Sequence, residues 1–259
     1  GAPPGALFTR KVPVTSHSLI IPTRNRPDYI LNAVAYYLRN SSSNHKIECI
    51  VCDGSDDPEN VASSLAEFKQ DPRLVLIDNS VKSTGVVSSM KANWSCAINA
   101  ANGEWLTVIG DDDLLDPAVL DLITEVERAL PTVSAISWEM VQFDHGIPPH
   151  KASRTPLRVP FKNECRLIDT RQSLVNALNW TSKLKPPPII CGIYHGAVRR
   201  DALDAVKKAR PDRVSIFDND MVDYDFGWTL CDLLDLALFT TRPWSVNGHS
   251  YKSNSFAIG

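Results

Sequence analysis

The sequence has no long apolar run and little net charge. No stretch approaches the roughly 18 apolar residues of a membrane-spanning helix, and the start, GAPPGALFTRKVPV, lacks the charged-then-apolar order of a signal peptide. The 259 residues carry a formal charge of -3, and no run is rich in Lys or Arg. A dedicated nucleic-acid or anionic-membrane binder is therefore not favoured. We expect a soluble, cytoplasmic protein, and leave open peripheral contact with a membrane and a place within a longer protein.

Cysteine is scarce and scattered. Of the six thiols only Cys49 and Cys52 are close together, and both lie inside the apolar run IECIVCD. A zinc site would need a second such pair. We therefore expect buried free thiols and a reducing compartment.

The first half of the sequence alternates strands with helices. Apolar runs predict strands at 17–22, 46–53, 73–78 and 104–110, and helical periodicity predicts helices at 27–39, 54–69 and 88–102. Pro27 suits the first turn of a helix, and Asp57 suits an N-cap. With 43% hydrophobic residues the chain can bury a substantial core. The pattern predicts an α/β fold, a single compact domain with a mostly parallel central sheet flanked by helices.

The second half is less regular. We expect a helix at 116–130 with Asp116 as N-cap, a strand at 134–138, strand, turn and helix start at 190–203, a helix at 223–235 and a last strand at 236–241. Residues 139–190 show no sustained periodicity, so we expect loops and short elements that either shape a substrate cleft or are inert. Residues 243–259 are interpreted as a polar tail.

Three consecutive aspartates, Asp111 to Asp113, follow the fourth predicted strand. Like charges about 4 Å apart repel by about 1 kcal/mol even in water, so a cation or a proton must accompany them. In a parallel sheet, ligands bind beyond the carboxyl ends of the strands. Thr23 to Arg26 and Asp53, which follow other strands, should therefore converge with the aspartates at one edge. The alternative is that the aspartates are only turn and helix-entry acids.

Five segments occur in the order and approximate spacing found in glycosyltransferase family 2, which the sequence resembles: IIPTRNRPDYI, IVCDGSDD, MKANWSCAINAANGEWLTVIGDDDLLDP, CGIYHGAVRRDAL and VDYDFGW. The resemblance implies the GT-A fold, which is Rossmann-like. It also implies inverting transfer of a sugar from a nucleoside-diphosphate sugar, with UDP or dTDP favoured, to a hydroxyl of a glycan or another acceptor.

The resemblance divides the chain into three parts. Residues 1–16 would be an N-terminal extension, residues 17–138 a nucleotide-sugar-binding half, and residues 139–259 an acceptor-binding half with the catalytic base and a C-terminal tail. The nucleotide-binding residues that it implies are Pro22, Thr23, Arg26, Asp53, Lys91 and Asp111. Asp53 would accept a hydrogen bond from the base, Asp111 would bind the ribose, and Lys91 would contact the diphosphate. For Arg26 and Lys91 the alternative is an ordinary surface side chain.

A divalent cation, Mn²⁺ or Mg²⁺, would neutralise the diphosphate leaving group. The resemblance assigns Asp112 to this metal, with Asp113 in support. Gly110 stands where the family often has another aspartate. A C-terminal histidine often completes the metal site in related enzymes, which implies His249, and imidazole suits Mn²⁺ better than Mg²⁺. The alternative for His249 is a solvated side chain on a mobile tail.

Inverting transfer also needs a general base near the acceptor hydroxyl. The resemblance assigns this role to Asp223, with Val222 where the family has a glutamate. Asp225 is the rival, and Asp218 and Asp220 are further candidates. The alternative is that Asp223 only caps its helix.

Three other classes of protein stay open. A sugar-nucleotide pyrophosphorylase would carry a glycine-rich loop after the first strand, where this chain has PTRNRP. A catalytically inactive binding module would bind nucleotide or sugar without releasing a nucleoside diphosphate. A phospho-acceptor receiver domain also clusters aspartates at strand ends, but it is a much shorter chain.

Overall fold

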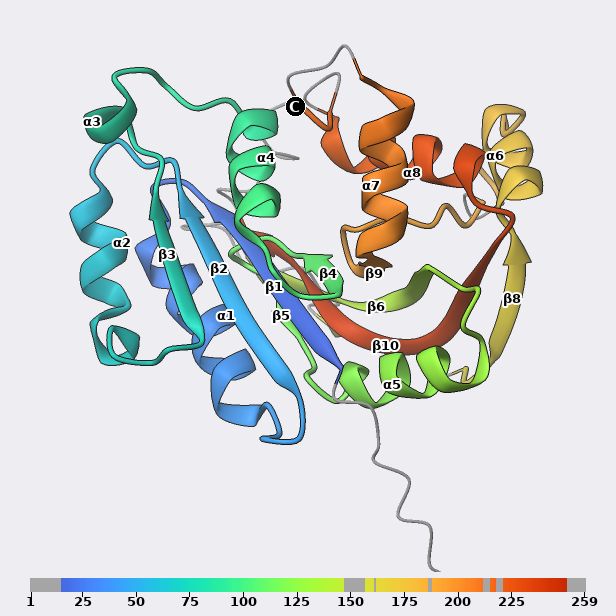
Figure 1. Ribbon diagram of the computed structural model, residues 1–259, viewed down its shortest axis with the longest axis horizontal. Helices are drawn as coiled ribbons and strands as arrows, with labels where there is room; N and C mark the ends of the chain where they lie inside the picture. The colour runs from blue at the N-terminus through green and yellow to red at the C-terminus, as the bar shows by residue number, and fades with distance from the viewer. Residues whose placement is uncertain are drawn as a thin grey trace, which may run out of the picture.

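The computed structural model describes residues 15–146, 157–160, 162–185, 188–211, 215–217 and 221–250. Within them a single twisted sheet carries helices on both faces, as Figure 1 shows. The strand order is β3-β2-β1-β4-β9-β6-β10-β5, with β7 beside β6 and β8 beside β10. The prediction of an α/β fold around a mostly parallel central sheet is confirmed. Most of the predicted N-terminal extension lies outside the described residues.

The first half forms the parallel part of the sheet. Its strands are β1 (Ser16–Thr23), β2 (Lys46–Asp53), β3 (Leu74–Asp78) and β4 (Trp105–Val108). The helical segments between them are α1 (Pro27–Asn40), α2 (Pro58–Ser64), the 3-10 helix η1 (Ala66–Phe68), α3 (Val81–Thr84) and α4 (Met90–Ala100). The register pairs Thr23 with Asp53 and Asp53 with Asp78, so three strands end at one edge of the sheet.

Helices cover both faces of this sheet. Helices α1, α2 and α5 (Val119–Ala129) pack on one face, and α4, α7 (Arg200–Ala209) and α8 (Val222–Leu233) pack on the other. Because β1 is covered from both sides, consecutive residues such as Leu19, Ile20 and Ile21 are all fully buried. Asp57 caps α2 as predicted, by accepting a hydrogen bond from the Glu59 amide. The prediction for Asp116 is wrong, because α5 starts at Val119 and its N-cap is Ala118.

The second half adds strands of both directions. They are β5 (Leu114–Leu115), β6 (Ala135–Gly146), β7 (Leu157–Arg158), β8 (Cys165–Asp169), β9 (Gly196–Arg199) and β10 (Leu236–Ser250), with helix α6 (Thr170–Leu178) after β8. Strand β9 is antiparallel to both β4 and β6, and β6 is parallel to β10. The expectation of loops and short elements over residues 139–190 agrees with the described part of this segment, which contains the end of β6, the short strands β7 and β8, and α6.

The last strand is longer than the sequence indicated. Strand β10 continues to Ser250, so residues 243–250 belong to the sheet and are not a polar tail. The register against β6 shifts between Thr240 and Ser245, around Pro243, and pairing then resumes. Proline cannot donate a ladder hydrogen bond, which explains both the interruption and the predicted end at 241.

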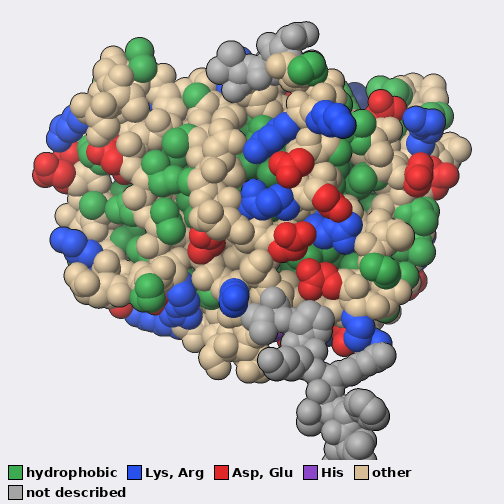
Figure 2. Space-filling view, viewed as in Figure 1, with side chains coloured by type: hydrophobic (Ala, Val, Ile, Leu, Met, Phe, Trp, Pro, Cys, Tyr) green, Lys and Arg blue, Asp and Glu red, His purple; other side chains and the backbone are tan. Residues whose placement is uncertain are grey.

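The cysteines, the lengths of the helices and the surface charge bear on the expectations drawn from composition. All six cysteines are free; four are buried as expected, whereas Cys165 is exposed. Among the described residues no helix is long and apolar enough to cross a membrane. On the face shown in Figure 2, acidic and basic side chains are interspersed over α7, without a basic stripe among the residues drawn in colour.

Candidate active site

Asp111 lies in the loop after β4 and is held by two side chains, one from the last residue of β1 and one from the start of α1. Thr23 Oγ1 donates to Asp111 Oδ2 at 2.6 Å, and Arg26 Nη1 donates to Asp111 Oδ1 at 2.8 Å. Burial raises the pKa of Asp111 to about 6, although the Arg26 charge and both hydrogen bonds oppose the rise. The structure thus brings together three of the predicted nucleotide-binding residues. Pro22, directly before Thr23, is partly exposed at the same strand end.

Asp112 is the most accessible of the three aspartates. Its side chain is 7% exposed, against 3% for Asp111 and 0% for Asp113. Its Oδ2 accepts a hydrogen bond from Ser250 Oγ at 2.6 Å and lies 3.9 Å from Arg26 Nη1. The Arg26 guanidinium therefore contacts both Asp111 and Asp112. The positive charge of Arg26 therefore offsets part of the repulsion between the neighbouring aspartate carboxylates.

Asp113 is fully buried and is surrounded by donors from distant parts of the chain. Its carboxylate accepts hydrogen bonds from the amides of Gly110 and Gly248, each at 2.7 Å, and from Tyr194 Oη at 3.0 Å. His195 Nε2 lies 3.1 Å from Asp113 Oδ2. Burial alone would raise the pKa of Asp113, but the His195 interaction and the amide hydrogen bonds hold it below the usual value. Asp113 can therefore position the acidic loop but is not accessible to a ligand.

Gly248 is required by the close approach of β10 to this loop. A Cβ atom at position 248 would lie 1.9 Å from the Asp112 carbonyl oxygen, well inside van der Waals contact. The neighbouring Ser250 contacts Asp112. The end of β10, which the sequence indicated as a tail, is therefore a wall of the site.

Two histidines lie near the acidic loop in different ways. His249 is in β10, partly buried, with its Nε2 2.9 Å from Gln142 Oε1 on β6. His145, at the end of β6, has its Nε2 3.4 Å from the backbone oxygen of Asp112, and a Cβ at Gly248 would lie 2.9 Å from the same nitrogen. The alternative that placed His249 on a mobile tail is wrong. Sequence reasoning missed His145 because residues 139–190 showed no periodic pattern. Within the described part of the chain, no group of three or more His, Cys, Asp or Glu side chains could hold a metal ion.

Asp53, at the end of β2, is buried with one carboxylate oxygen unsatisfied. Its Oδ1 accepts a hydrogen bond from the Ser55 amide at 2.9 Å, while Oδ2 is buried and has no hydrogen-bond partner within the described residues. Burial raises the pKa of Asp53, interactions with the Ser55 side chain and amide oppose the rise, and the charges of Asp78 and Asp57 add to it. A buried carboxylate oxygen without a donor is costly, and such atoms are rare in folded proteins.

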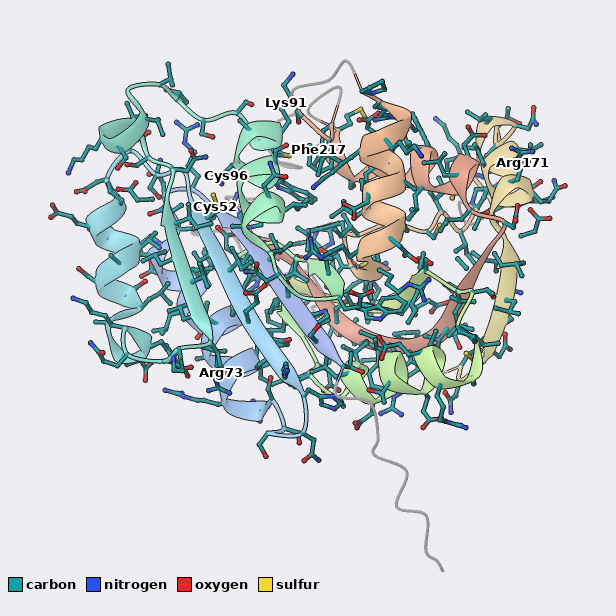
Figure 3. The ribbon with its side chains drawn as sticks, in the orientation of Figure 1. Cys52, Arg73, Lys91, Cys96, Arg171 and Phe217 are labelled. Carbon is teal, nitrogen blue, oxygen red and sulfur yellow. The ribbon has the colours of Figure 1, made fainter. Side chains whose placement is uncertain are left out.

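Helix α4 approaches the same edge of the sheet. Lys91 is in its first turn, partly buried, and Figure 3 shows it at the amino end of the helix. Asn93 was not predicted as a site residue. Its Nδ2 donates to the carbonyl oxygens of Cys52 at 3.0 Å and Thr23 at 3.3 Å, so it ties α4 to the ends of β1 and β2. The only signal in the sequence is a polar residue on the buried side of a helix.

Asp223 lies in the first turn of α8 and is partly buried. Burial raises its pKa, and hydrogen bonds from the helix amides and the charge of His195 oppose the rise. The N-cap residue is Met221, which makes no side-chain capping hydrogen bond, whereas first-turn amides interact with the Asp223 carboxylate, so a helix-start role for Asp223 stays beside the catalytic one.

Asp225, the other candidate for the general base, forms an ion pair with Arg210. It is buried, and its two oxygens lie 3.2 and 3.3 Å from Arg210 Nη1 and Nη2 at the end of α7. Asp225 therefore joins α7 to α8. Asp218 and Asp220 lie outside the described residues.

The turn before β9 connects the acidic loop with α8. Tyr194 donates to Asp113, and its pKa is raised by burial and by neighbouring charges that include Asp113 and Asp223. His195 follows with a left-handed backbone, φ 48°, and its Nδ1 lies 2.8 Å from Ser245 Oγ on β10. A non-glycine residue in this conformation is strained and needs the surrounding contacts to hold it. The charges of Asp113 and Asp223 therefore both act on Tyr194 in this turn.

Acidic side chains therefore lie at one edge of the sheet, and a further acid, Asp223, lies in the first turn of α8. Glycosyl transferase family 2 matches residues 18–204. The chain belongs to that family. No curated protein matches the chain closely enough in sequence to count as a relative.

Solved structures with this fold include S. aureus TarS. TarS 1–349 in complex with UDP-GlcNAc has a TM-score of 0.58 at 12% identity, with 94% of this chain and 61% of that chain covered. TarS 1–349 in complex with UDP gives a TM-score of 0.55 at 13% identity, with 92% and 61% covered. The full-length TarS structure gives 0.53 at 14%, with 92% and 37% covered. The chain thus spans about 60% of the TarS 1–349 chain, and this likeness establishes the fold alone.

Proposed function

We propose that the protein is an inverting, metal-dependent glycosyltransferase that uses a UDP-sugar or dTDP-sugar as donor. The observation that carries the proposal is Asp53 Oδ2, a buried acceptor atom without a donor among the residues that the structure describes. Uracil and thymine each present an N–H group that can donate to such an oxygen. The two TarS complexes, which hold UDP-GlcNAc and UDP on the same fold, support a uridine nucleotide.

The rest of the donor would extend from Asp53 toward the acidic loop. Pro22 and Thr23 would line the base and ribose, and Asp111 would accept hydrogen bonds from ribose hydroxyls with lone pairs not used by Thr23 and Arg26. Lys91 at the amino end of α4 would contact the diphosphate, because both the side chain and the helix terminus favour an anion there.

The chemistry of the loop fits one divalent ion near Asp112. Asp113 is fully enclosed and Asp111 is held by Thr23 and Arg26, whereas Asp112 is the more accessible carboxylate. Asp112 would hold Mn²⁺ or Mg²⁺, and the ion would supply positive charge against the departing diphosphate. His249 would have to exchange Gln142 for the ion, and its role as second protein ligand stays a proposal.

Asp223 would act as the general base. Its raised pKa, caused by burial, brings the carboxylate closer to the acidity at which it can accept a proton effectively near neutral pH. It would take the proton of the acceptor hydroxyl while the oxygen bonds to the anomeric carbon and the bond to the diphosphate breaks. Attack from the face opposite the leaving group inverts the configuration.

A donor screen tests the proposed function. Nucleoside-diphosphate release would be measured with UDP-, dTDP- and GDP-sugars, each with Mn²⁺, Mg²⁺ or chelator, in parallel with calorimetric binding of the free nucleotides. We expect binding and metal-dependent release with a UDP- or dTDP-sugar. Binding without any release would instead identify an inactive binding module. A need for a nucleoside triphosphate and sugar phosphate would favour the pyrophosphorylase alternative.

A further inference from the structure

The surface around helix α6 is apolar and is not used by the proposed reaction. Leu178 on α6 is 68% exposed, and Leu184 in the following segment is 98% exposed. Across an open hollow of about 470 Å³ from Leu178, helix α8 presents two more apolar side chains. We define the α6 face as these exposed residues: Val175, Leu178, Trp180, Leu184, Trp228 and Leu233.

The geometry of α6 makes this face amphipathic. Val175 and Leu178 are three residues apart and lie on the same side of the helix, and Arg171 precedes Val175 by four residues on that side. Arg171 is well exposed, with its Nη2 3.8 Å from Asp232 of α8, and Figure 3 shows it at the outer edge of the molecule. Leu184 lies at most about 14 Å along the chain from Trp180.

Positive charge accompanies these apolar side chains. Residues 157–185 contain six Lys or Arg and two Asp or Glu, a formal charge of +4, in a chain whose formal charge is -3. Lys183 and Lys185, on either side of Leu184, are both exposed. Exposed acids lie at and just after the end of helix α8, Asp232 and Asp235, and Asp232 offsets the charge of Arg171, so the positive charge on this face is concentrated at Lys183 and Lys185.

We propose that the α6 face binds the surface of an anionic lipid bilayer. Leucine and tryptophan side chains insert at the boundary between headgroups and acyl chains, while Lys and Arg extend their charges to anionic headgroups. A second copy of the chain is a poorer occupant, because two such segments would bring like charges together. The inference stands independently of the proposed function.

The position of this face suits an acceptor presented at a membrane. Helix α8 carries Trp228 and Leu233 on the α6 face and Asp223 in its first turn. At 1.5 Å per residue, Asp223 lies about 15 Å along the helix from Leu233. Membrane contact through the α6 face would thus bring Asp223 within the reach of groups that project from the lipid surface.

Vesicle flotation tests the proposal with the full chain. The probes are vesicles of phosphatidylcholine alone and of phosphatidylcholine with 30% phosphatidylglycerol, each in 50 mM and 500 mM NaCl. We expect binding to the anionic vesicles at low salt and much weaker binding at high salt or without phosphatidylglycerol, because salt screens the surface charges. The double variant Leu178→Ser, Trp180→Ser should bind at least about tenfold more weakly, since it removes two inserting side chains. Lys183→Glu, Lys185→Glu should lose the preference for anionic vesicles.

The matched control is Val86→Ser, Val87→Ser, which removes two apolar side chains of similar exposure, 68% and 61%, from the segment between α3 and α4. It should bind vesicles like the wild type, and thermal unfolding would verify that every variant is folded. The proposal is overturned if the wild type floats with neither vesicle, or if the control loses binding as much as the α6-face variant. It is also overturned if sedimentation shows a dimer that only the α6-face variant abolishes, which would make this face an interface between copies.

Discussion

At the scale of single residues, the acids of the site differ in how the chain satisfies them. Asp113 has donors on both oxygens, Asp111 has Thr23 and Arg26, and Asp53 keeps a buried oxygen without a partner in the described structure. A group that a protein leaves unsatisfied at a strand end is a candidate for ligand binding, whereas one that is fully satisfied supports the fold. Asp→Asn substitutions at these positions should therefore differ in their effects on ligand binding and on stability.

Asp53→Asn should weaken UDP binding without weakening the fold. An amide that presents its NH₂ group to the base cannot accept the N–H of uracil, so affinity should fall about 10- to 100-fold, as for a lost hydrogen bond to a charged group. The same change removes a desolvated charge, so the melting temperature should stay equal or rise. Calorimetry with UDP and thermal unfolding measure the two effects. Asp78→Asn, on the neighbouring strand, is the control, and equal UDP affinity in both variants would remove Asp53 from the donor site.

Asp223→Asn should lower transfer by about 10²- to 10⁴-fold with donor affinity nearly unchanged, because the amide cannot accept the proton. The acid limb of the pH–rate profile should lie above the usual aspartate pKa of 3.8, since burial raises the pKa of Asp223. Activity should fall as pH drops through that raised pKa, where the base becomes protonated. A variant with wild-type turnover, or a profile flat down to pH 4, would move the base elsewhere.

The pKa of Asp111 predicts a pH dependence of folding. The pKa is about 6 in the folded chain and 3.8 as the ordinary value, so the folded state binds this proton more tightly. The contribution to stability is therefore present below pH 3.8 and is lost as pH rises to about 6, at most about 3 kcal/mol. Without metal or nucleotide, Asp111→Asn should flatten this part of the pH–stability curve measured by urea unfolding. An unchanged slope between pH 4 and 6 would contradict the assignment.

At the scale of elements, the end of β10 determines the position of the acidic loop. Its backbone at Gly248 donates to Asp113, and the adjoining carbonyl of Asp112 leaves no space for a side chain at 248. The turn before β9 completes the enclosure, because His195 lies between Asp113 and Ser245 of β10. Two elements from the second half therefore support the acidic loop of the first half.

Gly248→Ala should displace this loop. The new methyl group would meet the Asp112 carbonyl oxygen, so we expect about 1–3 kcal/mol of destabilisation and at least a tenfold loss of Mn²⁺-dependent UDP affinity. Metal titrations in the presence of UDP measure the affinity, and urea unfolding measures the stability. The neighbouring change Asn247→Ala should be mild in both assays. Equal behaviour of the two variants would show that the close approach of β10 has no role in the site.

His249→Ala and His145→Ala separate the two histidines near the loop. If His249 completes the metal site, its removal should reduce Mn²⁺ affinity in the presence of UDP about tenfold or more, and reduce Mg²⁺ affinity less. His145→Ala should change the affinity less, because in the proposed site His145 has only its contact with the Asp112 backbone oxygen and no place at the metal. The reverse order would transfer the role to His145. Wild-type affinity in both variants would leave water to complete the site.

At the scale of the whole molecule, the first half was predictable because its signals are local. Buried parallel strands such as β1 give continuous apolar runs, and Asp57 and Pro58 mark the start of α2 in the sequence. The second half depends on pairings between distant segments: β10 pairs with β6, β8 and β5, and its ladder is interrupted near Pro243. Hence the sequence did not predict the strand around His249 or the place of His145. The residues of the loops in the first half were placed as expected, while their chemical roles stay predictions.

The anomer that forms first from a UDP-sugar shows whether the protein is an inverting, metal-dependent glycosyltransferase. Proton NMR would follow the α-linked donor that the screen selects, incubated with wild-type protein and Mn²⁺, with or without acceptor, and with the Asp112→Asn variant as control. We expect Mn²⁺-dependent UDP release, a product that is initially the β-anomer, and a large loss of both in the variant, which should still be folded because Asp112 contributes little to the core. An initial α-anomer, or UDP release unaffected by chelator and by the Asp112 substitution, would contradict the proposed function.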